Sequence, residues 1–319
     1  MKKAIVLLIV MVCLAAGIWG IFMLRGSAGK AGDHVENDNG NTGVAADVTE
    51  SGTTTEEQTA DSQETTEVTE EEKPSLVDET LAGMTLHEKV CQMMFVTPEE
   101  LTGEDGVTVA GDATRQALEN YPVGGIVYFA KNLESQDQVK EMIDNSQKYS
   151  SIGLFVATDE EGGVVNRLMD TVGTTYIGSM YYYKDDGDET AYENAYTIAN
   201  DMSALGFNLD FAPVADVWSN PDNTVIGERA YSDDYAQAAE LVGNAVKGFN
   251  DGGVMCTLKH FPGHGDTAED SHYSSAYVHR TKEEIMADEM QPFRSGIEAG
   301  AEFVMVGHLS VPGITGDNT

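Results

Sequence analysis

Residues 259–272, KHFPGHGDTAEDSH, contain three of the seven histidines, one lysine and three carboxylates. Two glycines and a proline in this stretch argue against a regular helix. The residues just before it, 254–258, are apolar and β-prone, which is typical of a buried strand. Polar side chains therefore gather where a strand ends and a loop begins. α/β barrels and open α/β sheets place their functional sites at this point.

Asp270 and His272 are two residues apart, so the carboxylate can accept a hydrogen bond from the imidazole. Such a bond would fix the tautomer of the ring and stabilise its protonated form, which suits a proton shuttle. Lys259 and His260 close the strand and offer donors to a polar ligand. A plain solvated loop is one alternative. The other is a metal site, for which the available ligands are His260, His264, Asp270 and His272.

Polar residues also follow the neighbouring predicted strands. Asp159 begins the sequence DEEGG, and Arg167 comes four residues after its second glycine. A carboxylate at a strand end can bind two sugar hydroxyls, and an arginine can hold further oxygens, although an acidic turn is the alternative. Arg229 follows the next strand and either binds the ligand or pairs with a structural carboxylate. His308 ends the last strand and either lines the site or is a hydrogen-bonded core residue.

Helical and strand patterns alternate along residues 75–319, which predicts parallel βαβ units. The sequence Thr85-Leu86-His87-Glu88 has the form of a capping box, so a helix should begin near Thr85. Strands are predicted at residues 93–96, 125–129, 154–157, 208–213, 254–258 and 302–306. Helices are predicted at residues 113–120, 136–149, 189–205, 235–251 and 282–299, the last bent at Pro292. The fold class is therefore α/β, a (β/α)₈ TIM-type barrel of which about six strands are found before Thr319.

Two apolar runs are assigned to packing. Met93-Met94 is expected in the core. The run Tyr181-Tyr182-Tyr183 could stack on sugars, but packing and surface exposure are the preferred interpretation.

Residues 259–272 resemble the signature of the β-N-acetylhexosaminidase branch of glycoside hydrolase family 3. That branch has Lys-His, Phe or Ile, Pro-Gly-His-Gly, four variable residues and then Asp-Ser-His, and every fixed position matches. The resemblance implies that Asp270 and His272 are the acid/base dyad of a retaining glycosidase. It also implies that Lys259 and His260 contact the sugar, and that the protein needs no metal and no cofactor.

The resemblance extends to the other polar positions. Asp159 and Arg167 match the family's Asp-x-Glu-Gly-Gly motif with its following arginine, which implies that both bind the sugar. Arg229 matches the arginine of an Ile-Gly-x-Arg segment and is the implied substrate arginine. Two departures are present: Val164 stands where many relatives carry an arginine, and Ala230-Tyr231 replaces the usual Ser-Phe.

The family's aspartate nucleophile lies in a Ser-Asp-Asp-Leu-like segment well downstream of the histidine loop. No such segment follows His272 in this sequence. The expected function is hydrolysis of terminal β-linked N-acetylglucosamine, on glycans derived from peptidoglycan. The alternative is a catalytically inactive, membrane-tethered protein that binds such glycans.

The sequence before residue 75 predicts a membrane anchor followed by a linker. Residues 4–24 carry no charge and follow two lysines, so residues 1–26 are expected to form a signal anchor with the folded domain outside the cytoplasm. Cleavage near Ala28, which would release the protein, is the alternative. Residues 27–74 are rich in Thr, Ser, Gly and acidic residues, which predicts a disordered linker.

The formal net charge of −36 argues against nucleic acid as a partner, because phosphates would be repelled. Three cysteines do not make a disulfide framework. Cys91 and Cys256 lie in apolar sequence and are expected to be buried thiols, with a bridge between them as the alternative.

Overall fold

The computed structural model of the chain describes residues 75–268 and 276–316. The predicted anchor at residues 1–26 and the predicted linker at residues 27–74 lie outside this part. The two residues of the predicted dyad, Asp270 and His272, also lie outside it. Within the described ranges, no helix is both long and apolar enough to cross a membrane. All described residues belong to the domain predicted for residues 75–319.

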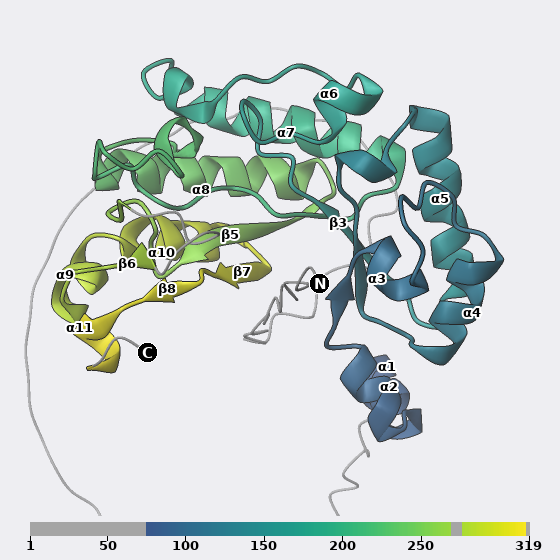
Figure 1. Cartoon of the computed structure of the whole chain (residues 1–319). Coiled ribbons are helices and arrows are strands. Elements are labelled where there is room, and N and C mark those ends of the chain that lie inside the picture. Colours follow the sequence, from purple (N-terminus) through teal and green to yellow (C-terminus); the bar gives the residue numbers. More distant parts are fainter. Residues whose placement is uncertain (1–74, 269–275, 317–319) are drawn as a thin grey trace, which may run out of the picture. The chain divides into compact units, whose positions relative to one another are not determined.

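The main sheet contains six parallel strands, and each strand pairs with the next one of the sheet along the chain, in the order β1-β2-β3-β4-β5-β7. A sequential order winds the sheet as in a barrel, whereas a doubly wound sheet reverses its order. The sheet is accordingly curled (Figure 1). All six predicted strands are confirmed: β1 (Phe95–Val96), β2 (Gly125–Val127), β3 (Phe155–Thr158), β4 (Leu209–Asp210), β5 (Met255–Phe261) and β7 (Phe303–Val306).

The long helices lie outside the curve of this sheet (Figure 1). Each of them packs against the next, so they form one continuous layer. Several begin with a side-chain cap, as at Ser135 and Asp234, which accept hydrogen bonds from the backbone N–H groups of Gln138 and Gln237. The helices of this layer are α4 (Asp112–Asn120), α5 (Gln136–Tyr149), α7 (Asp188–Leu205), α8 (Tyr235–Asp251) and α10 (Met290–Ala299).

The single helix predicted at residues 282–299 was wrong. Two helices occupy this stretch, α9 (Lys282–Ala287) and α10, and the break falls at Asp288 and Glu289. Pro292 lies in the first turn of α10, where its missing N–H removes no helical hydrogen bond. The proline therefore does not bend a continuous helix.

Shorter elements complete the described part. The capping box at Thr85 is confirmed, because its side chain accepts from the Glu88 N–H while the Glu88 side chain accepts from the Thr85 N–H. β6 and β8 pair in parallel as a small second sheet. These elements are α1 (Leu76–Gly83), α2 (Leu86–Cys91), α3 (Pro98–Thr102), η1 (Ala130–Asn132), α6 (Leu168–Val172), η2 (Met180–Tyr183), η3 (Gly227–Arg229), β6 (Ala276–Tyr277), β8 (Leu309–Ser310) and α11 (Pro312–Thr315).

The sheet buries apolar side chains on both faces. The outer face packs against the helix layer and contributes to the larger core. The inner face carries a second cluster, in which Leu209 and Phe211 point inward while Ala212 packs with the outer core. This alternation follows from the two-residue period of a strand. The inner cluster comprises Val127, Ala157, Leu209, Phe211 and Phe303, with Phe95, Phe129, Phe155, Met255 and Met305 partly buried against it.

Two expectations about single residues have different outcomes. The placement of Met93-Met94 in the core was wrong: β1 starts only at Phe95, and Met93 is 74% exposed. Hydrophobic residues next to a short strand look the same in sequence whether the strand includes them or not. Cys91 and Cys256 are free, buried thiols, as expected.

Candidate active site

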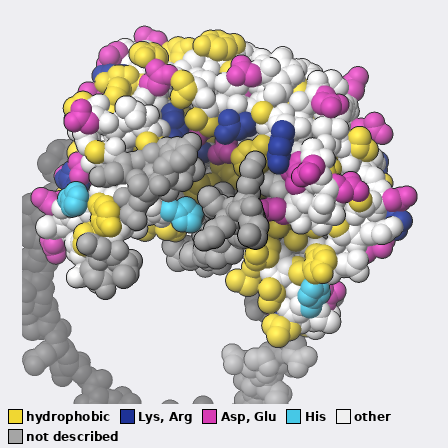
Figure 2. All heavy atoms as spheres, viewed as in Figure 1, with side chains coloured by type: hydrophobic (Ala, Val, Ile, Leu, Met, Phe, Trp, Pro, Cys, Tyr) yellow, Lys and Arg dark blue, Asp and Glu magenta, His cyan; other side chains and the backbone are white. Residues whose placement is uncertain are grey.

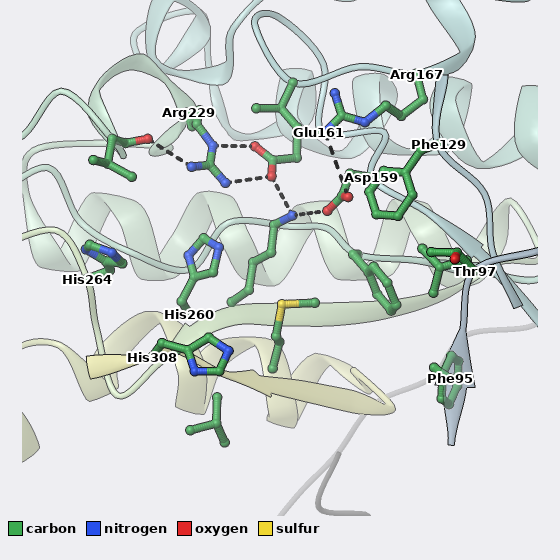
Figure 3. Close-up of a pocket in the computed structure, with 18 of the residues that line it drawn as sticks. Phe95, Thr97, Phe129, Asp159, Glu161, Arg167, Arg229, His260, His264 and His308 are labelled. Atoms are coloured by element: carbon green, nitrogen blue, oxygen red, sulfur yellow. Dashed lines mark hydrogen bonds and ion pairs between the residues drawn. The ribbon is translucent and has the colours of Figure 1, made fainter. Parts of the chain in front are cut away.

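A cavity of about 390 Å³ lies at the carboxyl ends of the parallel strands. Figure 2 shows Lys and Arg side chains gathered in the hollow, close to hydrophobic side chains. Every strand of the main sheet contributes to the cavity, either directly or through the loop that follows it. Labelled residues in Figure 3 illustrate this: Thr97 after β1, Phe129 after β2, Asp159 after β3, Arg229 after β4, His260 in β5 and His308 after β7.

Lys259 joins two loops at the centre of the polar wall. Its Nζ lies 2.8 Å from Asp159 Oδ1 and 2.5 Å from Glu161 Oε1, although Asp159 is 100 residues away in sequence. The Lys259 side chain is only 2% exposed. Burial alone would lower the pKa of Lys259, but the two carboxylates outweigh it and the pKa is raised. Lys259 is therefore charged and held in one position.

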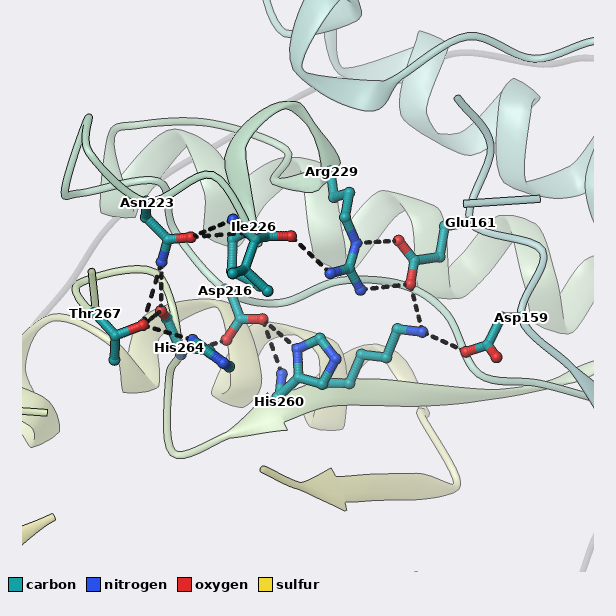
Figure 4. Close-up of polar contacts among 11 residues, drawn as sticks. Asp159, Glu161, Asp216, Asn223, Ile226, Arg229, His260, His264 and Thr267 are labelled. Carbon is teal, nitrogen blue, oxygen red and sulfur yellow. Dashed lines mark hydrogen bonds and ion pairs between the residues drawn. The ribbon is translucent and has the colours of Figure 1, made fainter. Parts of the chain in front are cut away.

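Arg229 completes the pairing of Glu161. Its Nε and Nη2 donate to the two oxygens of Glu161, each at 2.8 Å, and its Nη1 donates to the Val225 carbonyl at 2.9 Å. Burial would raise the pKa of Glu161, yet Lys259 and Arg229 hold it at about 2. The guanidinium pKa is raised in turn by Glu161 despite burial. Arg229 thus both lines the cavity and forms the carboxylate pair that was the alternative interpretation (Figure 4).

Asp159 and Arg167 form the looser part of the polar wall. Their closest charged atoms, Asp159 Oδ2 and Arg167 Nη2, are 3.9 Å apart, and their side chains are 19% and 28% exposed. Glu160 fixes the backbone between them, because its carboxylate accepts the N–H groups of Arg167 and Leu168 at 2.6 and 2.7 Å. Asp159 and Arg167 therefore keep polar atoms accessible from the cavity on a backbone that is held in place.

His260 is oriented by a buried carboxylate. Asp216 Oδ2 accepts from the ring Nδ1 of His260 at 2.6 Å and from its backbone N–H at 3.0 Å. Burial would raise the pKa of Asp216, but the neighbouring His260 and the donated hydrogen bonds lower it. Burial lowers the pKa of His260, which favours the neutral ring. Since a carboxylate only accepts, Nδ1 carries the proton and Nε2 is the acceptor.

The loop after His260 is anchored at its first turn. The other oxygen of Asp216 accepts the His264 N–H at 2.7 Å, and the His264 ring Nδ1 lies 2.7 Å from Thr267 Oγ1. Asn223 donates to the His264 carbonyl at 2.8 Å (Figure 4). These contacts fix the beginning of the loop that leads to Asp270 and His272.

Apolar side chains make up another part of the cavity lining. Phe95, Phe129, Phe211 and Met305 line the cavity together with the charged groups, and Phe129 lies beside Asp159 (Figure 3). A sugar ring has hydroxyls around its edge and C–H groups on its faces. A cavity with carboxylates, cations and aromatic side chains can therefore hold such a ring by hydrogen bonds and by apolar contact at once.

Metal binding by the histidine loop finds no support within residues 75–268 and 276–316. No three His, Cys, Asp or Glu side chains are grouped there so that they could hold a metal ion. The ring Nδ1 atoms of His260 and His264 already have partners. The metal alternative also needed Asp270 and His272, which lie outside the described residues.

The five predicted sugar-binding residues meet in this one cavity: Asp159, Arg167, Arg229, Lys259 and His260. His308 lines it too, at an exposed position. Sequence analysis did not identify Glu161, which joins the two cations, or Asp216, which orients His260. A possible signal for Asp216 was a single acid inside the apolar segment that follows β4. The acid/base roles of Asp270 and His272 remain predictions.

Comparison with known proteins gives the family. The model of the glycosyl hydrolase family 3 N-terminal domain matches residues 85–319, which is most of the chain. The chain belongs to glycoside hydrolase family 3. Its curled sheet of six parallel strands, with the site at the carboxyl ends, fits the TIM-like N-terminal domain of this family.

Several of the similar proteins are β-hexosaminidases. The chain is 34% identical over 219 residues to a β-hexosaminidase of Xylella fastidiosa, covering 67% of this chain and 64% of that protein. It is 36% identical over 216 residues to β-hexosaminidase LpqI of Mycobacterium tuberculosis, covering 66% and 54%. The structure of a family 3 β-N-acetylglucosaminidase from Paenibacillus sp. str. FPU-7 matches with a TM-score of 0.67 and 37% identity, covering 72% and 43%. The chain thus spans less than two thirds of the length of each.

Proposed function

We propose that this family 3 chain carries the sugar-binding and acid/base part of a β-N-acetylhexosaminidase that hydrolyses terminal β-linked N-acetylglucosamine. The observation that carries the proposal is the position of Lys259 between Asp159 and Glu161, with Glu161 held in turn by Arg229. Such paired charges on an apolar cavity suit a neutral, hydroxyl-rich ring. The names of the relatives support N-acetylglucosamine as that ring.

Within this cavity, Asp159 would accept hydrogen bonds from sugar hydroxyls and Arg167 would donate to sugar oxygens, because both are partly exposed. The neutral His260 would present its Nε2 as an acceptor. Lys259 would use its remaining donor capacity, since an ammonium has three N–H groups and two acceptors are already in contact. The ligand is then bound by donors and acceptors whose positions are fixed beforehand.

For the chemistry, His272 oriented by Asp270 would protonate the departing glycosidic oxygen and later take a proton from water. As the family resemblance implies, an aspartate nucleophile, for which no matching segment follows His272 here, would form a bond to the anomeric carbon as the bond to the departing oxygen breaks, and the deprotonated water would then displace that aspartate. The loop that carries the dyad begins at His264, whose backbone is anchored by Asp216 and Asn223. These anchors hold the start of that loop beside the sugar-binding wall.

The test is release of nitrophenol from an aryl β-N-acetylglucosaminide by the full chain, beside His272→Ala. If His272 is the acid/base group, we expect its loss to lower turnover by about 10²-fold or more. Binding of N-acetylglucosamine, measured by saturation-transfer NMR, should persist in His272→Ala and weaken in Asp159→Asn. Turnover that is unaffected in His272→Ala would contradict the proposed dyad.

A glycan-binding protein without turnover is the second candidate. It is favoured by the sugar-binding wall itself, because Asp159, Arg167, Arg229, Lys259 and His260 all line one cavity. Binding of N-acetylglucosamine without any nitrophenol release from folded protein would support it. Membrane attachment through residues 1–26, with the domain outside the cytoplasm and peptidoglycan fragments as its ligands, completes the proposal. Fractionation of the full chain beside a chain starting at residue 75 tests the attachment.

A further inference from the structure

One buried side chain, Asn223, links the loop after β4 to the loop after β5. It is 1% exposed and is not among the residues that line the active-site cavity. Its Oδ1 accepts the N–H groups of Val225 and Ile226 at 2.9 and 2.8 Å. Its Nδ2 donates to the His264 carbonyl at 2.8 Å and lies 3.4 Å from Thr267 Oγ1 (Figure 4). Both acceptor positions and both donor hydrogens of the amide are therefore in use.

This full use of the amide makes Asn223 hard to replace. Aspartate has nearly the same shape, but an ionised carboxylate only accepts, so it would face the His264 carbonyl with no proton between the two oxygens. Serine can cap the N–H groups of Val225 and Ile226 in a similar turn, but its side chain is shorter. Both substitutions therefore cut the link to His264 while they keep an acceptor for the turn that follows Asn223.

The segment that Asn223 holds leads directly to Arg229. The Val225 carbonyl accepts from Arg229 Nη1 at 2.9 Å, and the Ile226 carbonyl accepts the Arg229 N–H at 2.9 Å. The same two residues thus bind Asn223 through their N–H groups and Arg229 through their carbonyls. Asn223 acts in this way on both the side chain and the backbone of Arg229 without lining the cavity itself.

Contacts from two directions set the position of the Arg229 guanidinium. Glu161 accepts from Nε and Nη2, and the Val225 carbonyl accepts from Nη1. These contacts use three of the five N–H groups of a guanidinium. Within the described part of the chain, two N–H groups therefore remain for a ligand in the cavity. Because the guanidinium is rigid and planar, a shift of the Val225 carbonyl would change the direction of those two groups.

General packing of the two loops is the alternative explanation for Asn223. These loops are also joined elsewhere, because the Asn220 N–H donates to the Gly265 carbonyl at 3.2 Å and Asn220 Nδ2 donates to the Asp266 carbonyl at 3.3 Å. The contacts of Asn220 hold the loops together without the Asn223 amide. What Asn223 adds is the position of residues 225–229.

We propose that Asn223 is a positioning residue for sugar binding, which fixes the backbone before Arg229 against His264 and thereby sets the direction in which Arg229 meets the ligand. This inference rests on the proposed function, in which Arg229 belongs to the sugar-binding wall. Asp216 binds both the His264 N–H and the His260 ring. The Asn223 amide therefore also places the donors of Arg229 in a fixed relation to the acceptor of His260.

The experiment compares full-length Asn223→Asp with the wild type by two NMR measurements. The first is the Nε–H resonance of Arg229 in ¹⁵N-labelled protein, assigned by its loss in Arg229→Lys, and it needs no ligand. The second is the affinity for N-acetylglucosamine from a saturation-transfer titration. We expect the resonance to shift and the affinity to fall about tenfold, which is the effect of one or two hydrogen bonds. Asn223→Ser should act in the same direction, and it replaces Asn223→Asp if that variant does not fold.

Asn208→Asp is the matched control. Asn208 Oδ1 accepts the Val156 N–H at 2.7 Å, and its Nδ2 donates to the Leu154 carbonyl at 2.9 Å. Asn208 directly precedes β4, so this link lies at the amino ends of the strands, opposite the cavity. The same exchange of an amide for a carboxylate should leave both the Arg229 resonance and the affinity at their wild-type values.

Four outcomes decide the inference. An unshifted Arg229 resonance in folded Asn223→Asp would overturn it and leave the proposed function intact. A shifted resonance with unchanged affinity would also overturn it, because the direction of Arg229 would then not matter for binding. An equal loss of affinity in Asn208→Asp would do the same, because general destabilisation would explain the loss. A shifted resonance in Asn223→Asp, when the wild type itself does not bind N-acetylglucosamine, would support the positioning of Arg229 and contradict the proposed function.

Discussion

Asp216 holds His260 by two hydrogen bonds to the same carboxylate oxygen, one from the ring Nδ1 at 2.6 Å and one from the backbone N–H at 3.0 Å. The two residues are 44 apart in sequence and come from the loop after β4 and from β5. Because the carboxylate fixes the proton on Nδ1, the side of His260 that faces the cavity is an acceptor.

Asp216→Asn should allow the His260 ring to adopt its other tautomer as well. An amide NH₂ would face at least one of the three N–H donors that now contact the carboxylate, including the His264 N–H. We expect the free energy of unfolding to fall by about 1–3 kcal/mol. The ¹⁵N shifts of the His260 ring should change from a single Nδ1–H tautomer to a mixture. Unchanged shifts would mean that Asp216 is only a structural residue.

Lys259→Met tests the buried charge network. The substitution keeps most of the side-chain volume but leaves Asp159 and Glu161 without their shared cation. We expect a loss of about 3–5 kcal/mol in the free energy of unfolding at neutral pH, because buried charges lose their partner. Urea denaturation measures this loss. Arg115→Ala is the control, since it removes exposed ion pairs with Asp112 and Glu119 and should change stability little.

Glu161→Gln should remove a contribution to the free energy of unfolding that depends on pH. The folded protein holds the pKa of Glu161 at about 2, below its ordinary value of 4.5. The stabilisation from its ionised form is therefore present above about pH 4.5 and is lost as the pH falls toward 2. The difference in stability between wild type and Glu161→Gln should be largest near neutral pH and shrink over that range. A difference that stays constant with pH would contradict this origin.

Much of the fold could be predicted because its signals are local. The capping box at Thr85 and the apolar runs at β2, β3 and β5 depend on neighbouring residues, and each was found near its predicted place. The break between α9 and α10 was missed because Pro292 was taken as the point where one helix bends. Proline is tolerated in the first turn of a helix, and Pro292 lies in the first turn of α10. Met93 was misplaced because a two-residue strand leaves too short a pattern to define its start.

The site was predictable in part for a related reason. Positions after strand ends are read directly from sequence, so Asp159, Arg167 and Lys259 could be placed at one edge. Which charges pair there depends on tertiary distance. Glu161 and Arg229 are 68 residues apart, and the sequence gives no sign that this carboxylate, and not its neighbour Glu160, faces the cavity. The fold of the loop after β3 decides it, because Glu160 turns to the backbone N–H groups of Arg167 and Leu168 while Glu161 lines the cavity.

Asp210 provides the last prediction. It lies in β4 without exposed surface, and one of its oxygens accepts the Glu160 N–H at 3.0 Å. Burial, with the nearby Glu160 charge, raises the pKa of Asp210 well above its usual value. A raised carboxyl pKa stabilises the fold at low pH, and this contribution is lost as the pH rises through the folded pKa.

Asp210→Asn never ionises and keeps an acceptor for Glu160, so it should gain stability relative to wild type as the pH rises. Urea unfolding at about pH 4, 6 and 8 measures the gain. Asp144→Asn, an exposed change on α5 that also removes one negative charge, corrects for the relief of general repulsion in this acidic chain. A deficit in Asp210→Asn that is equal at every pH would mean that the carboxylate form is the one the fold requires.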